Sequence, residues 1–364
     1  MSRLHRVSLI LLLSLLSVGA HAQRRPVRGK AARPGGLKKA SPVKLLTGLQ
    51  GFEAWVTSVT FSPDGKQLLA GSYGVIRRWD ATGKKELPGL KVSSGYVRGL
   101  AFSPDGKQLA AGHYQRVSLF DVKSGKRVFE LKGQRGQVTG VAFSPDGKWL
   151  ASSSDDETVH VWDVAGGKSV RVLEGHRYPV QGVAFSPDGK TIVSAAGDET
   201  RVTKKGEVIS WDSVTGRQLA VFRDHKKAAT GVAFSPDGRY LVTTSFDETV
   251  NVYEVGREQP LGFFGGHGRP TTSVVFSPDG RIVVSGSGGR AKGKNEIKLW
   301  NRASGEVVAT VDDHAAQVTD VALSPDGRLL LTASNDKTAR LYDVGALALA
   351  GSARPAYSTL AIRS

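Results

Sequence analysis

The sequence predicts an all-β fold assembled from seven repeated units of four short strands. The tetrapeptide Ser-Pro-Asp-Gly occurs seven times, at intervals of 41, 41, 42, 49, 42 and 47 residues, and an apolar pair spaced by two residues precedes each copy. A period of this size is typical of stacked repeats, in which no single unit buries enough apolar surface to fold alone.

Within a unit, the elements follow one another in a fixed order. The apolar pair, such as Val183 and Phe185, marks a strand with one buried face. The Pro-Asp-Gly that follows favours a β-turn, so a hairpin is expected there. In the third unit the later strands are expected at 148–152, 158–162 and 169–173. The tetrapeptides begin at Ser62, Ser103, Ser144, Ser186, Ser235, Ser277 and Ser324.

The two long intervals come from insertions into the turn between the second and third strands. From the serine to the later aromatic residue there are 17 or 18 residues, but 25 in the fourth unit and 23 in the sixth. Removing the excesses of seven and five residues restores an interval of 42 residues in both units. The period is therefore regular along the chain.

The repeats also carry a recognisable set of polar and aromatic residues. In the fourth unit this set is Gly175-His176, Ser194, Asp198 and Trp211-Asp212, which resembles the signature of the WD-repeat family. Trp79-Asp80 and Trp162-Asp163 match its ending, and Phe120-Asp121, Tyr253-Glu254, Trp300-Asn301 and Tyr342-Asp343 are relaxed versions. The resemblance implies a seven-bladed β-propeller of four-stranded antiparallel blades around a central channel, which we place at residues 45–350.

The two ends of the repeat region suggest how such a ring closes. Residues 42–49 look like the fourth strand of a unit, but no first three strands precede them. We expect this segment to complete the last blade. Residues 346–350 are the competing candidate for that strand, and residues 351–364 form a C-terminal tail.

The first residues predict export. Arg3 and Arg6 precede an apolar run that is too short to span a bilayer, and Ala20-His21-Ala22 offers small residues for cleavage. We therefore predict a signal peptide at 1–22, an exported protein that is periplasmic or extracellular, and no membrane span after cleavage. The following segment, 23–44, is basic and rich in Gly, Ala and Pro, as a flexible linker is. Either it is only solvated, or residues 24–44 contact a polyanion.

The amino-acid composition excludes several kinds of chemical site. The chain has 364 residues and no cysteine, which excludes disulfides, thiolate metal sites and a cysteine nucleophile. Ten of the 50 basic residues and none of the 33 acidic ones lie in residues 1–44, so the remainder carries a formal charge of only +7.

Histidine, hydroxyl and aspartate residues recur together, which raises the question of a catalytic triad. The WD-repeat resemblance instead implies a structural network that joins these groups to the aromatic residue of the third strand. The expected network residues are His176, Ser194, Asp198, Trp211, His225, Thr243, Asp247, Tyr253, His314, Thr332, Asp336 and Tyr342. Because three units repeat the same set, we predict no enzyme, no catalytic residue, no metal site and no cofactor. A secreted propeller hydrolase or lactonase that uses the central channel is the alternative.

A partner is expected on the rim that carries the histidine loops, called the upper face below. The first two units lack the histidine and the aspartate, and present the aromatic residues Trp55, Tyr73, Tyr96 and Tyr114 instead. Such rings either anchor a partner protein or cover the turns beneath them. The inserted loops add the basic residues Arg201, Lys204, Lys205, Arg290, Lys292 and Lys294. We therefore predict a monomeric scaffold that binds another protein, with a polyanion-binding propeller as the second possibility.

Overall fold

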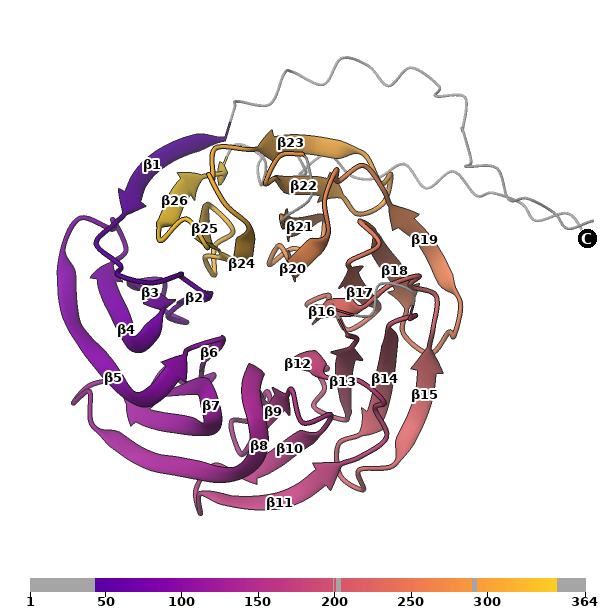
Figure 1. Cartoon of the computed structure of the whole chain (residues 1–364), viewed down its shortest axis with the longest axis horizontal. Coiled ribbons are helices and arrows are strands. Elements are labelled where there is room, and N and C mark those ends of the chain that lie inside the picture. Colours follow the sequence, from indigo (N-terminus) through magenta and orange to yellow (C-terminus); the bar gives the residue numbers. More distant parts are fainter. Residues whose placement is uncertain (1–42, 199, 201–203, 290–292, 346–364) are drawn as a thin grey trace, which may run out of the picture. The chain divides into compact units, whose positions relative to one another are not determined.

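The computed structural model describes residues 43–198, 200, 204–289 and 293–345, and these fold into 26 β-strands around a central opening (Figure 1). The strands are β1 (Lys44–Leu49), β2 (Ser58–Phe61), β3 (Gln67–Gly71), β4 (Tyr73–Asp80), β5 (Glu86–Tyr96), β6 (Gly99–Phe102), β7 (Gln108–Asp121), β8 (Arg127–Phe143), β9 (Trp149–Ser154), β10 (Val159–Asp163), β11 (Lys168–Leu173), β12 (Val180–Phe185), β13 (Thr191–Ala196), β14 (Glu207–Asp212), β15 (Gln218–Phe222), β16 (Ala229–Phe234), β17 (Tyr240–Ser245), β18 (Val250–Glu254), β19 (Pro260–Phe264), β20 (Thr271–Phe276), β21 (Ile282–Ser287), β22 (Ile297–Asn301), β23 (Val307–Val311), β24 (Val318–Leu323), β25 (Leu329–Ser334) and β26 (Ala339–Asp343). The predicted signal peptide, the linker up to residue 42 and the tail lie outside the described residues. Among those described, no helix has the length and apolarity to cross a membrane.

The strands form antiparallel sheets arranged radially around the opening. Five sheets have four strands, for example β12-β13-β14-β15, with the first strand nearest the opening and the last at the outside (Figure 1). The remaining sheet has six strands in the order β11-β10-β9-β8-β7-β6. The structure thus confirms an all-β propeller of antiparallel four-stranded sheets. It contains six separate sheets, however, where seven were predicted.

The six-stranded sheet arises because two strands continue where the other repeats have a break. β7 pairs with β6 through residues 109–112 and with β8 through residues 114–120. β8 in turn pairs with β7 up to Gln137 and with β9 from Val138 onward. The second and third repeats are therefore hydrogen-bonded into one sheet.

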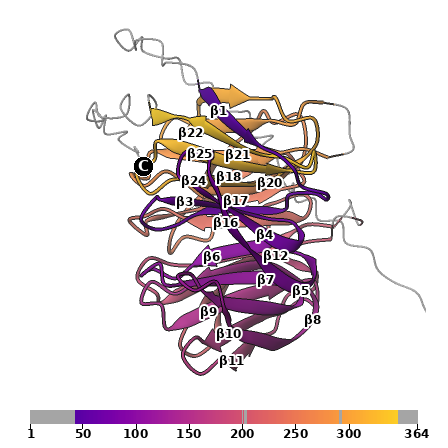
Figure 2. The same cartoon turned by 90° about the vertical axis from the view of Figure 1, so that its left-hand side faces the viewer.

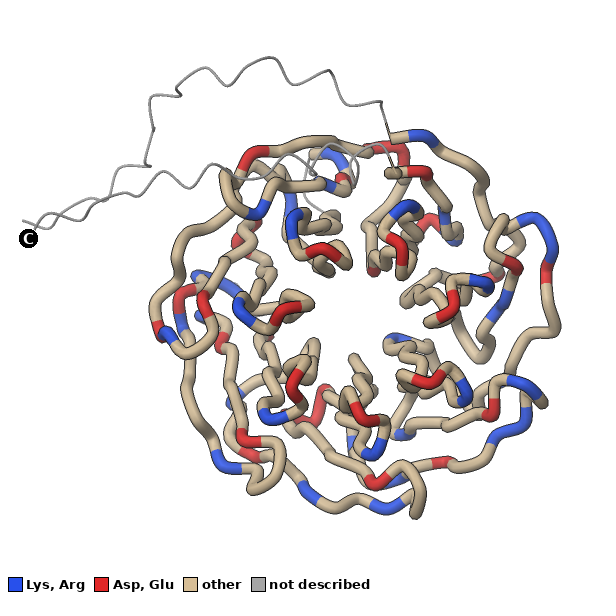
Figure 3. The backbone as a smooth tube through the Cα atoms, turned by 180° about the vertical axis from the view of Figure 1, so that it is seen from behind, with Lys and Arg blue, Asp and Glu red and all other residues tan. Residues whose placement is uncertain are grey.

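The Ser-Pro-Asp-Gly segments form the predicted turns, and their serine has a role that the sequence did not reveal. In the fourth repeat the Ser186 hydroxyl donates to Asp188 Oδ1 at 2.6 Å and accepts the Thr191 N–H at 2.9 Å. Asp188 Oδ1 also accepts the Lys190 N–H at 3.0 Å. Serine and aspartate thus satisfy backbone donors inside each turn. Figure 3 shows the acidic and basic residues of these turns in pairs around the central opening.

Contacts between neighbouring turns run around the whole ring. A β-carbon added at Gly106 would lie 3.7 Å from Pro63 of the preceding turn, and one added at Gly65 of the first turn would lie 3.7 Å from Pro325 of the last. The same relation joins Gly147 to Pro104, Gly189 to Pro145, Gly238 to Pro187, Gly280 to Pro236, and Gly327 to Pro278. The seven turns therefore form a closed cycle on one face, which we call the lower face.

The ring closes through the segment predicted for this purpose. β1 pairs antiparallel with β26, with Lys44 opposite Asp343 and Leu49 opposite Ala339. Figure 2, which looks onto this seam, shows β1 beside the yellow strands of the last repeat. The expectation for residues 42–49 is confirmed from Lys44 onward, whereas the competing segment 346–350 lies outside the described residues.

Hydrogen bonds between the innermost strands join successive repeats. A threonine hydroxyl donates to a backbone carbonyl of the next inner strand in several repeats, and the Thr319 hydroxyl donates to Val56 O at 2.7 Å across the seam. The other donors are Thr57, Thr139, Thr230 and Thr272. Apolar side chains fill the space between adjacent sheets; Val161 of one sheet, for example, shares a buried cluster with Ile192 and Trp211 of the next. The core is thus distributed around the ring, as expected for stacked units.

Candidate interaction surface

The predicted histidine networks are present and buried. His225 Nε2 lies 2.8 Å from the Thr243 hydroxyl, and His176 Nε2 lies 2.6 Å from the Ser194 hydroxyl. His314 lies 2.8 Å from Thr332 in the same way. Thr243 and Ser194 are fully buried. These hydroxyls face their own network and no open surface.

A carboxylate holds the second imidazole nitrogen. Asp247 lies 3.1 Å from His225 Nδ1, and Asp336 lies 2.8 Å from His314 Nδ1. Burial alone raises the pKa of Asp247, but its hydrogen bond to His225 and the charge interaction outweigh burial and hold that pKa well below its usual range. The carboxylate therefore stays ionised and fixes the ring orientation, as an architectural element does.

The fourth repeat departs from the prediction. Glu207, at the start of β14, lies 3.3 Å from His176 Nδ1 and also accepts the Arg177 N–H at 2.9 Å. Asp198, predicted for this position, accepts hydrogen bonds from Thr200. The prediction was wrong because the inserted residues lengthen this turn, and Glu207 then stands beside the histidine.

The aromatic residue of the third strand donates its hydrogen bond to different groups, depending on whether it is tryptophan or tyrosine. The Trp211 indole N–H donates to the Ser194 hydroxyl at 2.8 Å, as predicted. The Tyr253 hydroxyl instead donates to Asp224 at 3.2 Å, and the Tyr342 hydroxyl donates to Asp313 at 2.7 Å. Neither aspartate was predicted.

The residue before the histidine could have indicated which group the aromatic residue contacts. It is aspartate where the aromatic residue is tyrosine and glycine where it is tryptophan. A β-carbon added at Gly175 would lie 3.1 Å from the Trp211 ring. Gly133, Gly175 and Gly266 also share a positive φ, which a residue with a β-carbon rarely adopts.

Two further repeats hold related networks that the sequence analysis did not assign. In the sixth, the hydroxyl of Ser285 lies 2.7 Å from His267 Nε2 and accepts the Trp300 indole N–H. In the third, Gln134 replaces histidine and hydrogen-bonds to Ser152. Burial lowers the pKa of His267 to about 3, so its ring is neutral at ordinary pH. The recurrence of one arrangement in five repeats identifies it as part of the framework.

No group of three or more metal-binding side chains comes together within the described ranges. The glycine-rich insertion at 288–295 lies between β21 and β22 of one sheet. Asn295 is buried there, accepts a hydrogen bond from Arg269 and donates one to His314 O. It links the sixth repeat to the seventh.

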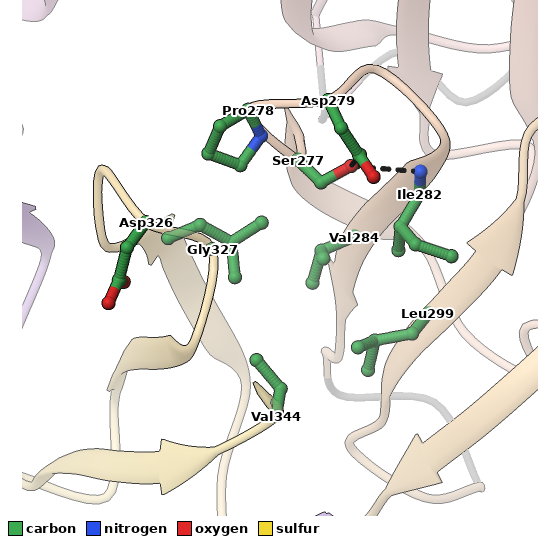
Figure 4. A pocket seen from close by; sticks show the side chains of 10 residues that line it. Ser277, Pro278, Asp279, Ile282, Val284, Leu299, Asp326, Gly327 and Val344 are labelled. Carbon is green, nitrogen blue, oxygen red and sulfur yellow. Dashed lines mark hydrogen bonds between the residues drawn. The ribbon is translucent and has the colours of Figure 1, made fainter. Parts of the chain in front are cut away.

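The lower face has an apolar pocket of about 110 Å³ between the sixth and seventh repeats. Figure 4 shows Val284, Leu299 and Val344 below the two turns that border it. The turn residues Asp279 and Asp326 stand at its edge. This pocket contains no aromatic side chain and lies on the face opposite to the predicted partner site.

The four predicted aromatic residues lie together on the upper face of the first two repeats; we call them the aromatic surface (Trp55, Tyr73, Tyr96 and Tyr114). Trp55 and Tyr96 stack with ring centroids 5.6 Å apart, and Tyr73 meets Tyr96 edge to face at 5.2 Å. A β-carbon added at Gly95 would lie 2.7 Å from Tyr114, which places that residue beside Tyr96. Even so, Trp55, Tyr73 and Tyr114 are 47%, 59% and 50% exposed.

The first two repeats also contain buried side chains close in sequence to this surface. Phe52 and Val56 are buried, and Phe52 packs on Trp79 with ring centroids 5.9 Å apart. In the second repeat, His113 is buried, with Nδ1 3.1 Å from Ser94 O and Nε2 3.0 Å from the Ser118 hydroxyl. Whether the aromatic surface anchors a partner or covers the turns beneath it stays a prediction.

The basic insertions are described only in part. Arg201, Arg290 and Lys292 lie outside the described residues. Lys294 forms an ion pair with Asp312 of the same repeat. Lys204 and Lys205 are exposed, and the following Gly206 N–H donates to Lys227 O, which brings these lysines beside those of the next repeat.

Comparisons with known proteins agree with this architecture. No curated protein matches the chain. The family described as WD domain, G-beta repeat matches residues 43–80, 85–121, 125–163, 167–200, 216–254, 258–301 and 305–343. The first match, for example, begins at β1, the outer strand of the last sheet, and ends at β4, the third strand of the first sheet, so it spans the seam at which β1 pairs with β26. With seven matched repeats spanning the whole ring, the chain belongs to the WD40 family.

Proposed function

We propose that this protein is a non-enzymatic scaffold that binds a partner protein through the aromatic surface. The observation that carries the proposal is the half-exposure of Trp55, Tyr73 and Tyr114, whereas their neighbours Phe52 and Val56 in the first repeat are buried. A contiguous group of exposed aromatic side chains is costly in water and is typical of binding sites. Propellers of this family are commonly protein-interaction scaffolds.

The framework suits this role because it holds the rings in place. Tyr73 and Tyr96 occupy directly opposed positions of β4 and β5, and Tyr114 is opposed to Gln137 of β8. The tyrosine rings therefore stand on paired strands, so binding a partner costs little entropy for ordering them. Assigning the two halves of β8 to successive repeats gives seven blades, which is the number that we propose for the ring.

We propose that the scaffold acts outside the cytoplasm, in the periplasm or beyond the cell. The support for this is the arrangement of residues 1–22, where two arginines precede a short apolar run and a small-residue cleavage site. Amino-terminal sequencing of the mature protein from the native cell tests this part. A chain that retains residues 1–22 and stays in the cytoplasm contradicts it.

The experiment for the binding site uses the double variant Trp55→Ala/Tyr73→Ala as bait in an affinity capture from the native envelope fraction. We expect the wild-type partner to be lost, whereas Val214→Ser, which alters an exposed apolar residue of the β14–β15 loop, retains it. Thermal melting of the three proteins should agree within about 3 °C, since surface substitutions change stability by roughly 0.5 kcal/mol. A partner that survives the double variant, or a large loss of stability, refutes the proposal.

A polyanion is the second candidate, because Lys204 and Lys205 stand beside Lys226 and Lys227 on the upper face. Binding through these lysines should fall steeply with salt, because counterions are released on binding. Retention on heparin should then collapse between 50 and 300 mM NaCl and weaken further in the Lys204→Gln/Lys205→Gln variant. Binding that persists at 300 mM NaCl and depends on Trp55 favours the protein partner.

A further inference from the structure

The outermost strand of the fifth repeat, β19, is the most exposed apolar strand of the described ring. Outer strands carry most of the exposed large apolar side chains, but Leu261 at 54% and Phe263 at 63% exceed those of the other outer strands. Phe264, the next residue, is buried and stacks on Trp300 with ring centroids 5.4 Å apart. The strand is therefore anchored at one end while its outer face stays uncovered.

The backbone around β19 is uncovered as well. A β-carbon added at Gly262 would have no other atom within 4 Å. The same holds for Gly256, Gly266 and Gly268, which flank the strand. β19 pairs with β18 on one side and has no described neighbour on the other. From Leu261 to Phe264 the free edge thus offers backbone donors and acceptors, whereas Pro260 at its start has no N–H to donate.

Charge distinguishes β19 from the other outer strands. No charged residue occurs from Gln259 to Gly266. β11 contains Lys168 and Arg171, and β15 and β23 each have charged residues directly before and after them. Charged side chains on an edge strand are the usual means of preventing edge-to-edge pairing. This protection is missing at β19.

We propose that β19 is a self-association edge, which pairs antiparallel with β19 of a second copy of this chain about a two-fold axis at Gly262. In this register Leu261 lies opposite Phe263 of the other copy, and Gly262 lies opposite Gly262. The segment is self-complementary, because both facing pairs are apolar and no like charges meet. The inference concerns the outer wall of the ring, so it stands apart from the proposed function at the aromatic surface. It also differs from the monomer that the sequence led us to expect.

The absence of cysteine from the chain permits a direct test. In the variant Gly262→Cys, the new thiols of two copies would face each other across the axis, within disulfide reach of a directly opposed pair. We expect a covalent dimer on mild oxidation at micromolar concentration. The matched control is Val172→Cys on β11, another exposed outer strand, which should stay monomeric. Equal crosslinking of both variants, or none in either, overturns the proposal.

Mass measurement by light scattering provides the second readout on the cysteine-free protein. We expect the wild type to pass from monomer to dimer as its concentration rises. Phe263→Lys should weaken this association by about tenfold, since it replaces two symmetry-related apolar pairs, whereas Val172→Lys should not. A monomeric mass up to 200 µM, or equal weakening by both substitutions, contradicts the proposal. Because both lysines replace exposed residues, a circular-dichroism melt confirms that each variant is folded.

Discussion

Asp320 provides the sharpest test of how the ring is closed. It lies on the innermost strand of the last repeat, β24, and its carboxylate accepts the Val59 N–H of the first repeat at 2.9 Å. It also accepts the Ser273 hydroxyl at 2.8 Å and its neighbour's N–H. Burial raises the pKa of Asp320 to about 6, with no cation nearby to offset it. The seam between the first and last repeats thus contains an acid that holds its proton more tightly than a carboxyl group in water does.

The sign of the pH effect follows from this shift. Because the folded protein holds the proton more tightly than the unfolded chain, whose pKa is near 3.8, the ionised group lowers stability at neutral pH. That loss disappears as the pH falls through 6 toward 3.8. The full shift corresponds to about 3 kcal/mol, of which about 2 kcal/mol is recovered between pH 7.5 and pH 4.

The perturbation is Asp320→Asn, which keeps the shape and removes the titration. Urea unfolding followed by circular dichroism at pH 7.5, 6, 5 and 4 gives the free energy of unfolding of both proteins. The wild type should gain about 2 kcal/mol relative to the variant between the first and last pH. The difference between the proteins cancels the titration of all other groups. A difference that stays constant with pH refutes the environment assigned to Asp320.

Three further changes test other parts of the account. Ser194→Ala should lower the free energy of unfolding by about 2–4 kcal/mol in urea titrations, because it leaves the Trp211 N–H and a His176 nitrogen without a partner; a loss below about 0.5 kcal/mol would show that the network is dispensable. Tyr342→Phe should lower the free energy of unfolding by about 1 kcal/mol, because it removes the hydrogen bond that the Tyr342 hydroxyl donates to Asp313; an unchanged free energy of unfolding would contradict this pairing. Gly99→Ala should lower the melting temperature by several degrees, because the added β-carbon would lie 2.9 Å from Val141 N. The control Gly262→Ala, at a position with open space around it, should leave the melting temperature unchanged. Equal effects of the two substitutions would argue against the close packing of the inner strands.

The repeating turns of this fold depend on short sequence segments, and their positions were predicted correctly. Each Ser-Pro-Asp-Gly turn depends on contacts within about five residues, as Ser186 and Asp188 show. The role of residues 44–49 could be inferred because a fourth strand without its three partners must pair elsewhere. Trp55 and Tyr96 could be placed near each other because both stand where the polar network is missing, and they do stack; their role in binding stays a prediction.

The wrong predictions concern residues whose hydrogen-bond or strand partners lie far away in the sequence. Glu207 displaces Asp198 because an insertion changes which carboxylate reaches His176. Asp224 and Asp313 accept the tyrosine hydroxyls because a tyrosine ring presents its donor at a different place from an indole. The continuation of β8 through two repeats likewise depends on pairing partners on both sides of it. None of these choices can be read from the period alone.

Closure of the ring by β1 and β26 can be measured directly with the variant Lys44→Cys/Asp343→Cys. These two residues are opposed in the strand pair, and the chain has no other cysteine. We predict an intramolecular disulfide in the monomer and a clear rise in melting temperature, since a bond closing so long a loop stabilises by about 5 kcal/mol. The control Lys44→Cys/Asn301→Cys, which uses the equivalent position of the sixth repeat, should form no such bond. Failure of the first pair to crosslink within one chain, or equal crosslinking of the control, would contradict a ring closed at this seam.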